Sequence, residues 1–125
     1  MDDDKVLELA TRIFDFARQG DAAQLAAYLE AGVPVQLTNA RGDNLLMLAA
    51  YYGHAAAVDT LLAHGADPNV LNDSGQTPLS GAVFKGDTDV IGALLAAGAD
   101  PDAGAPSARE TAITFERTDL LKLFP

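Results

Sequence analysis

Apolar residues in this chain form short stripes with helical spacing, and each stripe ends at a glycine. Within residues 55–64, Val58, Leu61 and Leu62 follow the i, i+3, i+4 spacing that places side chains on one face of a helix. Gly65 follows, and glycine commonly ends a helix because it accepts positive φ. The pattern predicts a series of short amphipathic helices separated by turns.

The pattern also repeats at a fixed distance. Gly53 recurs as Gly86 (86 − 53 = 33), and the run LLAHGADPN at residues 61–69 recurs as LLAAGADPD at residues 94–102. The phase holds from about residue 5 to residue 103, and the matched positions are glycines and leucine pairs, which have structural roles. One such unit cannot bury its apolar stripe alone, so the sequence predicts a solenoid of stacked units.

Each unit is predicted to contain two helices with recognisable starts. Asn44, Thr77 and Asp87 each stand at an expected N-cap, where a side-chain oxygen accepts from free amides of the first turn, and Pro78 takes the first helical position. Asp21 has the same capping role in the first unit. The predicted helix pair of the second unit spans residues 45–52 and 55–64, and turn-rich extended stretches are expected at residues 36–43, 69–76 and 102–109.

These residues carry a family resemblance. The period of 33, the run GQTPL at residues 75–79 and the run LAAYYGH at residues 48–54 are similar to those of ankyrin repeats. The resemblance implies an all-α solenoid of stacked antiparallel helix pairs with β-hairpin loops, acting as a protein-binding module without catalysis. The chain departs from the family's Thr-Pro-Leu-His tetrapeptide, because Met47 and Ser80 occupy the His position.

We expect one domain over residues 1–125, divided into an N-terminal capping repeat (5–37), two repeats (38–70 and 71–103) and a truncated C-terminal capping repeat (104–125). The first repeat opens with a helix of about residues 4–19, where Asp2 to Asp4 would complement the helix dipole. In the last repeat, six apolar side chains are expected to seal the end of the stack: Ile113, Phe115, Leu120, Leu121, Leu123 and Phe124.

Composition narrows the choice of partners. The chain has 125 residues, with 8 Lys and Arg against 18 Asp and Glu and a formal net charge of −10. Phosphate binding needs clustered basic residues, so nucleic acid is not expected as a partner. The acidic N-terminus does not resemble a signal peptide and no apolar run could span a bilayer, so we expect a cytoplasmic protein without membrane contact. Abundant alanine and scarce lysine suggest a bacterial source.

Two surfaces are candidates for binding. On the ankyrin repeat arrangement, residues near the ends of the inner helices face a concave groove, and the tips of the projecting hairpins are the second candidate surface. Tyr, Phe and Arg dominate interface hot spots, so such residues in the groove indicate a partner-binding surface. The alternative is that one tyrosine and Phe84 fill gaps between stacked helices. Gly81, inside a helix, would either leave room for a partner side chain or permit close helix packing. The candidate partner-binding residues are Arg18, Leu48, Tyr51, Tyr52, Phe84 and Lys85 in the groove and Arg41, Asp43 and Asp73 at the tips.

No residue pattern indicates catalysis, a cofactor or a metal site. Cysteine is absent. His54 and His64, ten residues apart, do not share a helix face, and Asp67, Asn69 and Asp73 lack the spacing of a calcium loop. We therefore expect a monomeric, non-enzymatic module that binds a partner protein with a basic surface. The alternative is an immunity-type inhibitor that neutralises a basic bacterial toxin or enzyme.

Overall fold

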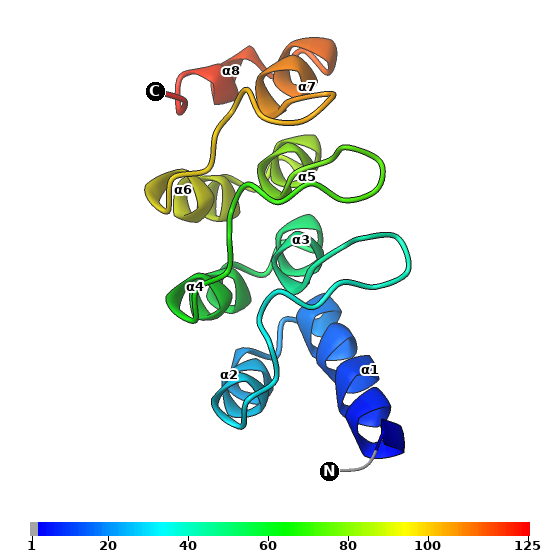
Figure 1. Ribbon diagram of the computed structural model, residues 1–125. Coiled ribbons are helices and arrows are strands. Elements are labelled where there is room, and N and C mark those ends of the chain that lie inside the picture. The colour runs from blue at the N-terminus through cyan, green and yellow to red at the C-terminus, as the bar shows by residue number, and fades with distance from the viewer. Residues whose placement is uncertain (1–2) are drawn as a thin grey trace.

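The computed structural model describes residues 3–125, with side chains from Leu7 onward, and this part of the chain folds into stacked helix pairs (Figure 1). The odd-numbered helices form one column of the stack and the even-numbered helices form the other, with the two described ends at opposite ends of the stack. The predicted interaction of Asp2 to Asp4 with the first helix lies outside the described side chains. In chain order the helices are α1 (Asp3–Gln19), α2 (Ala22–Glu30), α3 (Leu45–Tyr51), α4 (Ala55–Ala63), α5 (Pro78–Lys85), α6 (Thr88–Ala96), α7 (Ala108–Thr114) and α8 (Thr118–Leu121).

The predicted helix starts are confirmed. Asn44 Oδ1 accepts a hydrogen bond from the Met47 amide at 2.8 Å, and the side chains of Asp21 and Asp87 cap α2 and α6 in the same way. Thr77 forms a capping box with Ser80, each side chain accepting from the other residue's backbone amide. At the position of the family's histidine, Ser80 therefore stabilises the start of its own helix.

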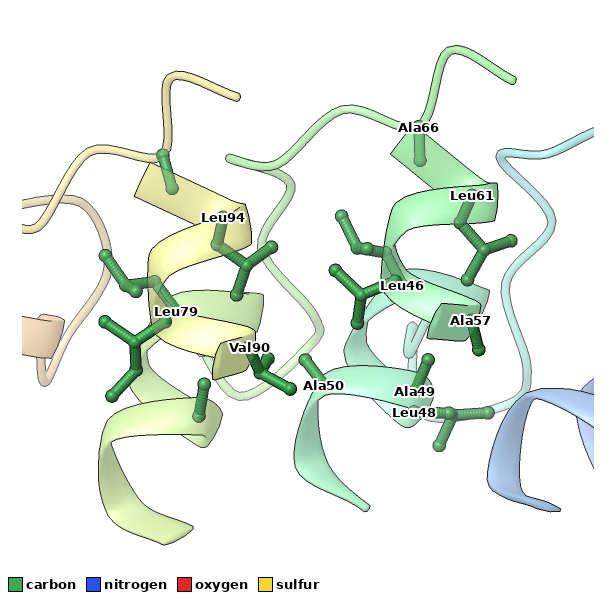
Figure 2. Close-up of a cluster of buried hydrophobic side chains, with 14 of the residues drawn as sticks. Leu46, Leu48, Ala49, Ala50, Ala57, Leu61, Ala66, Leu79, Val90 and Leu94 are labelled. Carbon is green, nitrogen blue, oxygen red and sulfur yellow. The ribbon is translucent and has the colours of Figure 1, made fainter. Parts of the chain in front are cut away.

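The core consists mainly of leucine, valine, isoleucine and alanine side chains held between successive helix pairs (Figure 2). Leu46, Leu61, Leu79 and Leu94 are fully or almost fully buried, and they alternate between the two columns of helices. We call the odd-numbered helices α1, α3, α5 and α7 the inner helices and the even-numbered helices the outer helices. Buried alanines such as Ala49 allow the inner helices to approach one another closely. Each helix pair therefore buries its apolar face against its neighbours, as the stripe pattern predicts.

Polar contacts between successive pairs repeat with the sequence. Asn69 donates from Nδ2 to the Gly98 carbonyl at 3.1 Å and accepts at Oδ1 from the Asp100 amide at 2.7 Å. One unit earlier, Gln36 donates to the Gly65 carbonyl at 3.3 Å. These contacts tie the loop that follows one outer helix to the next loop along the stack.

The loops before the inner helices have the shape of hairpins, but within residues 3–125 they contain no strands. Single antiparallel bridges join Thr38 to Asn44 and Gly104 to Ser107. Neighbouring loops are hydrogen-bonded to one another, with the Asp73 amide donating to the Arg41 carbonyl at 3.0 Å. The loops consequently form a connected rim along one side of the inner helices.

The last helix pair differs from the prediction. Ser107 and Glu110 form a capping box, so α7 begins at Ala108, inside the stretch 102–109 that was expected to be extended. The shortened element is α8, which has four residues where α4 and α6 have nine.

The prediction that six apolar side chains seal the end of the stack is wrong for three of them. Leu120 and Phe124 are buried and Leu121 packs against the core, whereas Ile113, Phe115 and Leu123 are exposed. Ile113 lies on α7 and Phe115 at its C-cap, where the four residues of α8 leave both exposed, and Leu123 lies beyond the end of α8. Within the described chain, no helix has the length and apolar character needed to cross a bilayer.

Candidate functional site

A groove of about 660 Å³ lies between the inner helices and the rim of loops. Three consecutive inner helices, α3, α5 and α7, contribute to it, together with the loops that precede them. Its side chains are therefore presented by packed helices with fixed N-caps. The lining residues are Arg41, Asp43, Met47, Leu48, Tyr51, Tyr52, Asn72, Gln76, Thr77, Ser80, Gly81, Phe84, Pro106, Thr111 and Phe115.

The repeat explains why these residues meet. Met47 and Ser80 occupy the same helical position one unit apart (80 − 47 = 33), as do Tyr51 and Phe84 (84 − 51 = 33). Stacked units place equivalent positions side by side, so one turn from each inner helix adds to a continuous surface. Residues distant in sequence thereby form one wall of the groove.

Four aromatic side chains dominate this wall. The exposed fractions are 40% for Tyr51, 51% for Tyr52, 51% for Phe84 and 55% for Phe115. Tyr51 and Tyr52 meet edge-to-face with 5.4 Å between ring centroids, and Phe84 and Phe115 do so at 5.2 Å. These exposed fractions leave ring surface available to a partner, although Tyr51 also packs beside Gly81 of the neighbouring helix, so both interpretations of the tyrosines and Phe84 stay open.

Gly81 leaves space in the floor of the groove. A Cβ atom on Gly81 would meet only Tyr51, at 3.7 Å from Cδ2 and 3.9 Å from Cβ, which are ordinary contact distances. Close packing of α5 against α3 and α7 therefore does not require a glycine here. Of the two roles considered for Gly81, the geometry favours room on the groove side.

The rim of the groove is polar. Asp43 accepts a hydrogen bond at 2.8 Å from Nδ2 of Asn72, which also donates to Gln76 Oε1 at 2.9 Å. Arg41 is exposed beside them. The ammonium group of Lys85 lies 4.6 Å from the centre of the Tyr51 ring. The groove thus combines an aromatic wall with a polar rim and two basic groups, Arg41 and Lys85.

Most of the predicted binding residues come together here. Leu48, Tyr51, Tyr52, Phe84, Arg41 and Asp43 line the groove, and Lys85 borders it. Two predicted residues do not line it. Arg18 instead pairs with Asp15 at 3.1 Å, and Asp73 contributes its backbone amide to the contact with the Arg41 carbonyl.

Sequence reasoning missed the contribution of the last helix pair. Phe115, Thr111 and Pro106 line the groove although only Phe115 was considered, as part of a seal. The N-caps Thr77 and Ser107 are 30 residues apart (107 − 77 = 30) instead of 33, which places Phe115 in register with Lys85. The Ser-x-x-Glu signature at residues 107–110 was the available signal for this register.

Ion pairs occupy most basic side chains outside the groove. Arg117 donates to Asp119 at 3.2 Å, which lowers the pKa of the Asp119 carboxyl and raises the pKa of the arginine. A hydrogen bond to Asp102 at 2.8 Å likewise raises the pKa of Arg109. Both guanidinium groups are therefore paired with carboxylates of the chain itself.

The histidines have structural contacts. His54 Nε2 lies 2.7 Å from the Arg18 carbonyl, linking the first two helix pairs, and His64 Nδ1 lies 2.9 Å from the Thr60 carbonyl within its own helix. Among residues 7–125, no group of three His, Asp or Glu side chains is arranged to hold a metal ion. Asp67 and Asp100 each accept from an amide two residues ahead, as their predicted place in turns requires.

Comparison with known proteins adds three findings. A family model for ankyrin repeats matches residues 13–105 in three copies. An ankyrin repeat protein of Pseudomonas aeruginosa is 49% identical over 47 residues, which cover 38% of this chain and 28% of that protein. The crystal structure of the human ASB11 ankyrin repeat domain matches with a TM-score of 0.68 and 31% identity, over 71% of this chain and 40% of that one. The chain thus spans well under half of the length of either relative.

Proposed function

Because the chain belongs to the ankyrin repeat family, whose members are generally non-enzymatic protein-binding modules, we propose that it binds a partner protein through the groove and the rim of loops. The observation that carries this proposal is the clustering of four exposed aromatic rings on one concave face. Exposed apolar patches of this kind commonly mark interaction sites, and aromatic side chains supply large contact areas at low entropic cost.

Rigidity supports the same proposal. The groove residues of α3 and α5 sit on helices with side-chain caps, and Leu45 and Leu79 anchor these helices in the core. A preformed surface loses little conformational freedom on binding, so more of the contact energy contributes to affinity.

Charge distinguishes the exterior from the groove. Exposed carboxylates such as Asp59, Asp67, Asp89 and Asp100 lie on the outer helices and the turns that follow them, whereas Asp43 is the single carboxylate among the lining residues. We propose that the acidic exterior attracts a partner with a basic surface and speeds its encounter. We further propose that the protein acts as a monomer in the bacterial cytoplasm, without catalysis or cofactor.

Affinity capture tests the proposed function. The bait is the wild-type chain or the double variant Tyr51→Ala, Phe84→Ala, in lysate of the source organism. The control bait, Leu71→Ala, Ile113→Ala, removes two exposed apolar side chains that do not line the groove. A partner retained by the wild type and the control and lost by the groove variant supports the proposal. Equal capture by three baits with equal urea midpoints contradicts it.

A narrower form of this function is inhibition of a basic toxin or enzyme. The net charge of −10 in a chain of 125 residues is the observation that favours it. The captured partner would then be a basic protein whose activity falls stoichiometrically when the wild-type chain is added. Unchanged activity in the saturated complex would exclude inhibition and leave the binding function in place.

A further inference from the structure

Two unpaired cations flank the groove. From Leu7 onward the chain has seven Lys and Arg residues, of which Arg12, Arg18, Arg109 and Arg117 form ion pairs of 3.2 Å or less. Within that part of the structure, the residues without an ion pair are Arg41, Lys85 and Lys122. Arg41 lines the groove, and the ammonium group of Lys85 lies over the ring of Tyr51, which also lines it.

This distribution runs against the composition of the chain. Asp and Glu outnumber Lys and Arg by 18 to 8, so carboxylates are available to most basic side chains. In the groove, the carboxylate of Asp43 already accepts a hydrogen bond from Asn72. Arg41 and Lys85 therefore offer positive charge at the groove of an otherwise acidic protein. Their charge complements carboxylates supplied by a partner.

The space beside Gly81 indicates what lies between those charges. Tyr51 borders it, and a methyl group at Gly81 would contact only the Tyr51 side chain, while Phe84 lines the same groove. A partner side chain placed there would contact the Tyr51 side chain within a groove lined by aromatic rings. Such an environment favours an aliphatic or aromatic group, because it removes apolar surface from water.

We propose that the groove binds a partner segment in which an apolar side chain inserts beside Gly81 and neighbouring Asp or Glu side chains reach Arg41 and Lys85. This inference rests on the proposed function and names the chemistry of the docked segment. It separates two electrostatic roles: the acidic exterior attracts the basic body of the partner, and the groove selects an acidic, apolar segment within it. Gly81 then determines specificity by keeping the floor of the groove open.

Selection from a library of random dodecapeptides displayed on phage tests this inference. The wild-type chain is the target, and enriched sequences are synthesised with a fluorescent label for anisotropy titration. We expect an apolar residue flanked by Asp or Glu, and at least a tenfold loss of affinity when either the apolar residue or the acidic pair is replaced by alanine. Enrichment of Lys-rich and Arg-rich sequences, or no enrichment, would overturn the proposal.

Glycine variants provide a matched control. Gly81 and Gly92 both lie inside helices, and a Cβ atom on Gly92 would meet nothing within 4 Å. Both Gly→Ala changes should raise the urea midpoint, because alanine favours the helix. Gly81→Ala should weaken peptide binding at least tenfold, whereas Gly92→Ala should leave it unchanged. Equal affinities for the two variants would contradict the role of Gly81.

Charge variants separate this inference from the proposed function. Arg41→Gln and Lys85→Gln should each weaken peptide binding about fivefold. Lys122→Gln, which removes the third cation without an ion pair from Leu7 onward, should not. If peptide binding survives these two changes but is lost in the double variant Tyr51→Ala, Phe84→Ala, the proposal of an acidic segment is contradicted. The proposal that the groove is the binding surface then remains. Binding that survives the double variant contradicts the groove itself.

Discussion

The ring of Phe115 meets the ring of Phe84 edge-on, with 5.2 Å between centroids and 80° between planes. This contact connects the last inner helix to the aromatic wall formed by α3 and α5. Both rings remain about half exposed, so the pair is a surface feature that a partner can cover. The groove consequently extends over three inner helices.

The aromatic pair predicts a binding effect at the last helix pair. Phe115→Ala removes contact area and one edge-to-face pair, which is worth about 0.5–1.5 kcal/mol beyond area burial. We expect the affinity for the captured partner to fall about tenfold, or about 1.4 kcal/mol, in a titration. Ile113→Ala, at a side chain of similar exposure that does not line the groove, serves as the control. Equal affinities for the two variants would remove Phe115 from the site.

Local signals explain how much of the fold was predictable. The N-caps Asn44, Thr77 and Asp87 lie where the sequence places them, because a cap depends on residues within one turn of itself. The place of Phe115 was not predictable from the 33-residue period. The loop before α7 brings Ser107 into register after 30 residues, and the local signal for this shift is the Ser-x-x-Glu capping signature at the start of α7.

The candidate site was predictable where the period holds and less so elsewhere. Tyr51 and Phe84 follow from the period, since equivalent positions in stacked units become neighbours. The choice between the two roles of Gly81 could not be made from the sequence, because it depends on the distance between α5 and the neighbouring Tyr51 side chain. The pairing of Arg18 with Asp15 was missed, although their i, i+3 spacing on one helix was the available signal.

The capping box of α7 predicts a stability effect. Ser107→Ala leaves the Glu110 amide without its partner and should lower the free energy of unfolding by about 1 kcal/mol, as N-cap losses do. Ser74→Ala, at an exposed loop tip, should change it by less than about 0.5 kcal/mol. Urea denaturation followed by circular dichroism measures both. A Ser107→Ala variant as stable as the wild type would argue against a folded α7.

The polar contacts between loops predict a graded effect. Asn69→Ala removes two hydrogen bonds, to Gly98 and from Asp100, and should cost about 1–2 kcal/mol of stability. Gln36→Ala removes one longer bond to Gly65 and should cost about 0.5 kcal/mol. The same urea titration measures the loss of unfolding free energy in each variant. The reverse order would show that the contact at Asn69 does not join neighbouring repeats as described.

Replacement of Gly20 is predicted to be costly because steric overlap adds to its positive φ. Its φ is +75°, and a Cβ atom would collide with the ring of His54, whose Nε2 is held by the Arg18 carbonyl. Gly20→Ala should therefore cost about 2–3 kcal/mol, combining backbone strain with overpacking. Gly65→Ala, at φ +91° in open space, should cost only about 1 kcal/mol of strain. Similar losses of unfolding free energy would contradict the steric role of His54.

Site-specific photo-crosslinking in living cells tests the central claim, that the groove is the surface that meets a protein partner. The photoreactive amino acid p-benzoylphenylalanine replaces Tyr52 in the groove or, in a second strain, the exposed Ala63 at the end of outer helix α4. The account predicts a discrete crosslinked protein from position 52, abolished by the additional change Phe84→Ala, and none from position 63. The same crosslinked protein from position 63, with none from position 52, would contradict it.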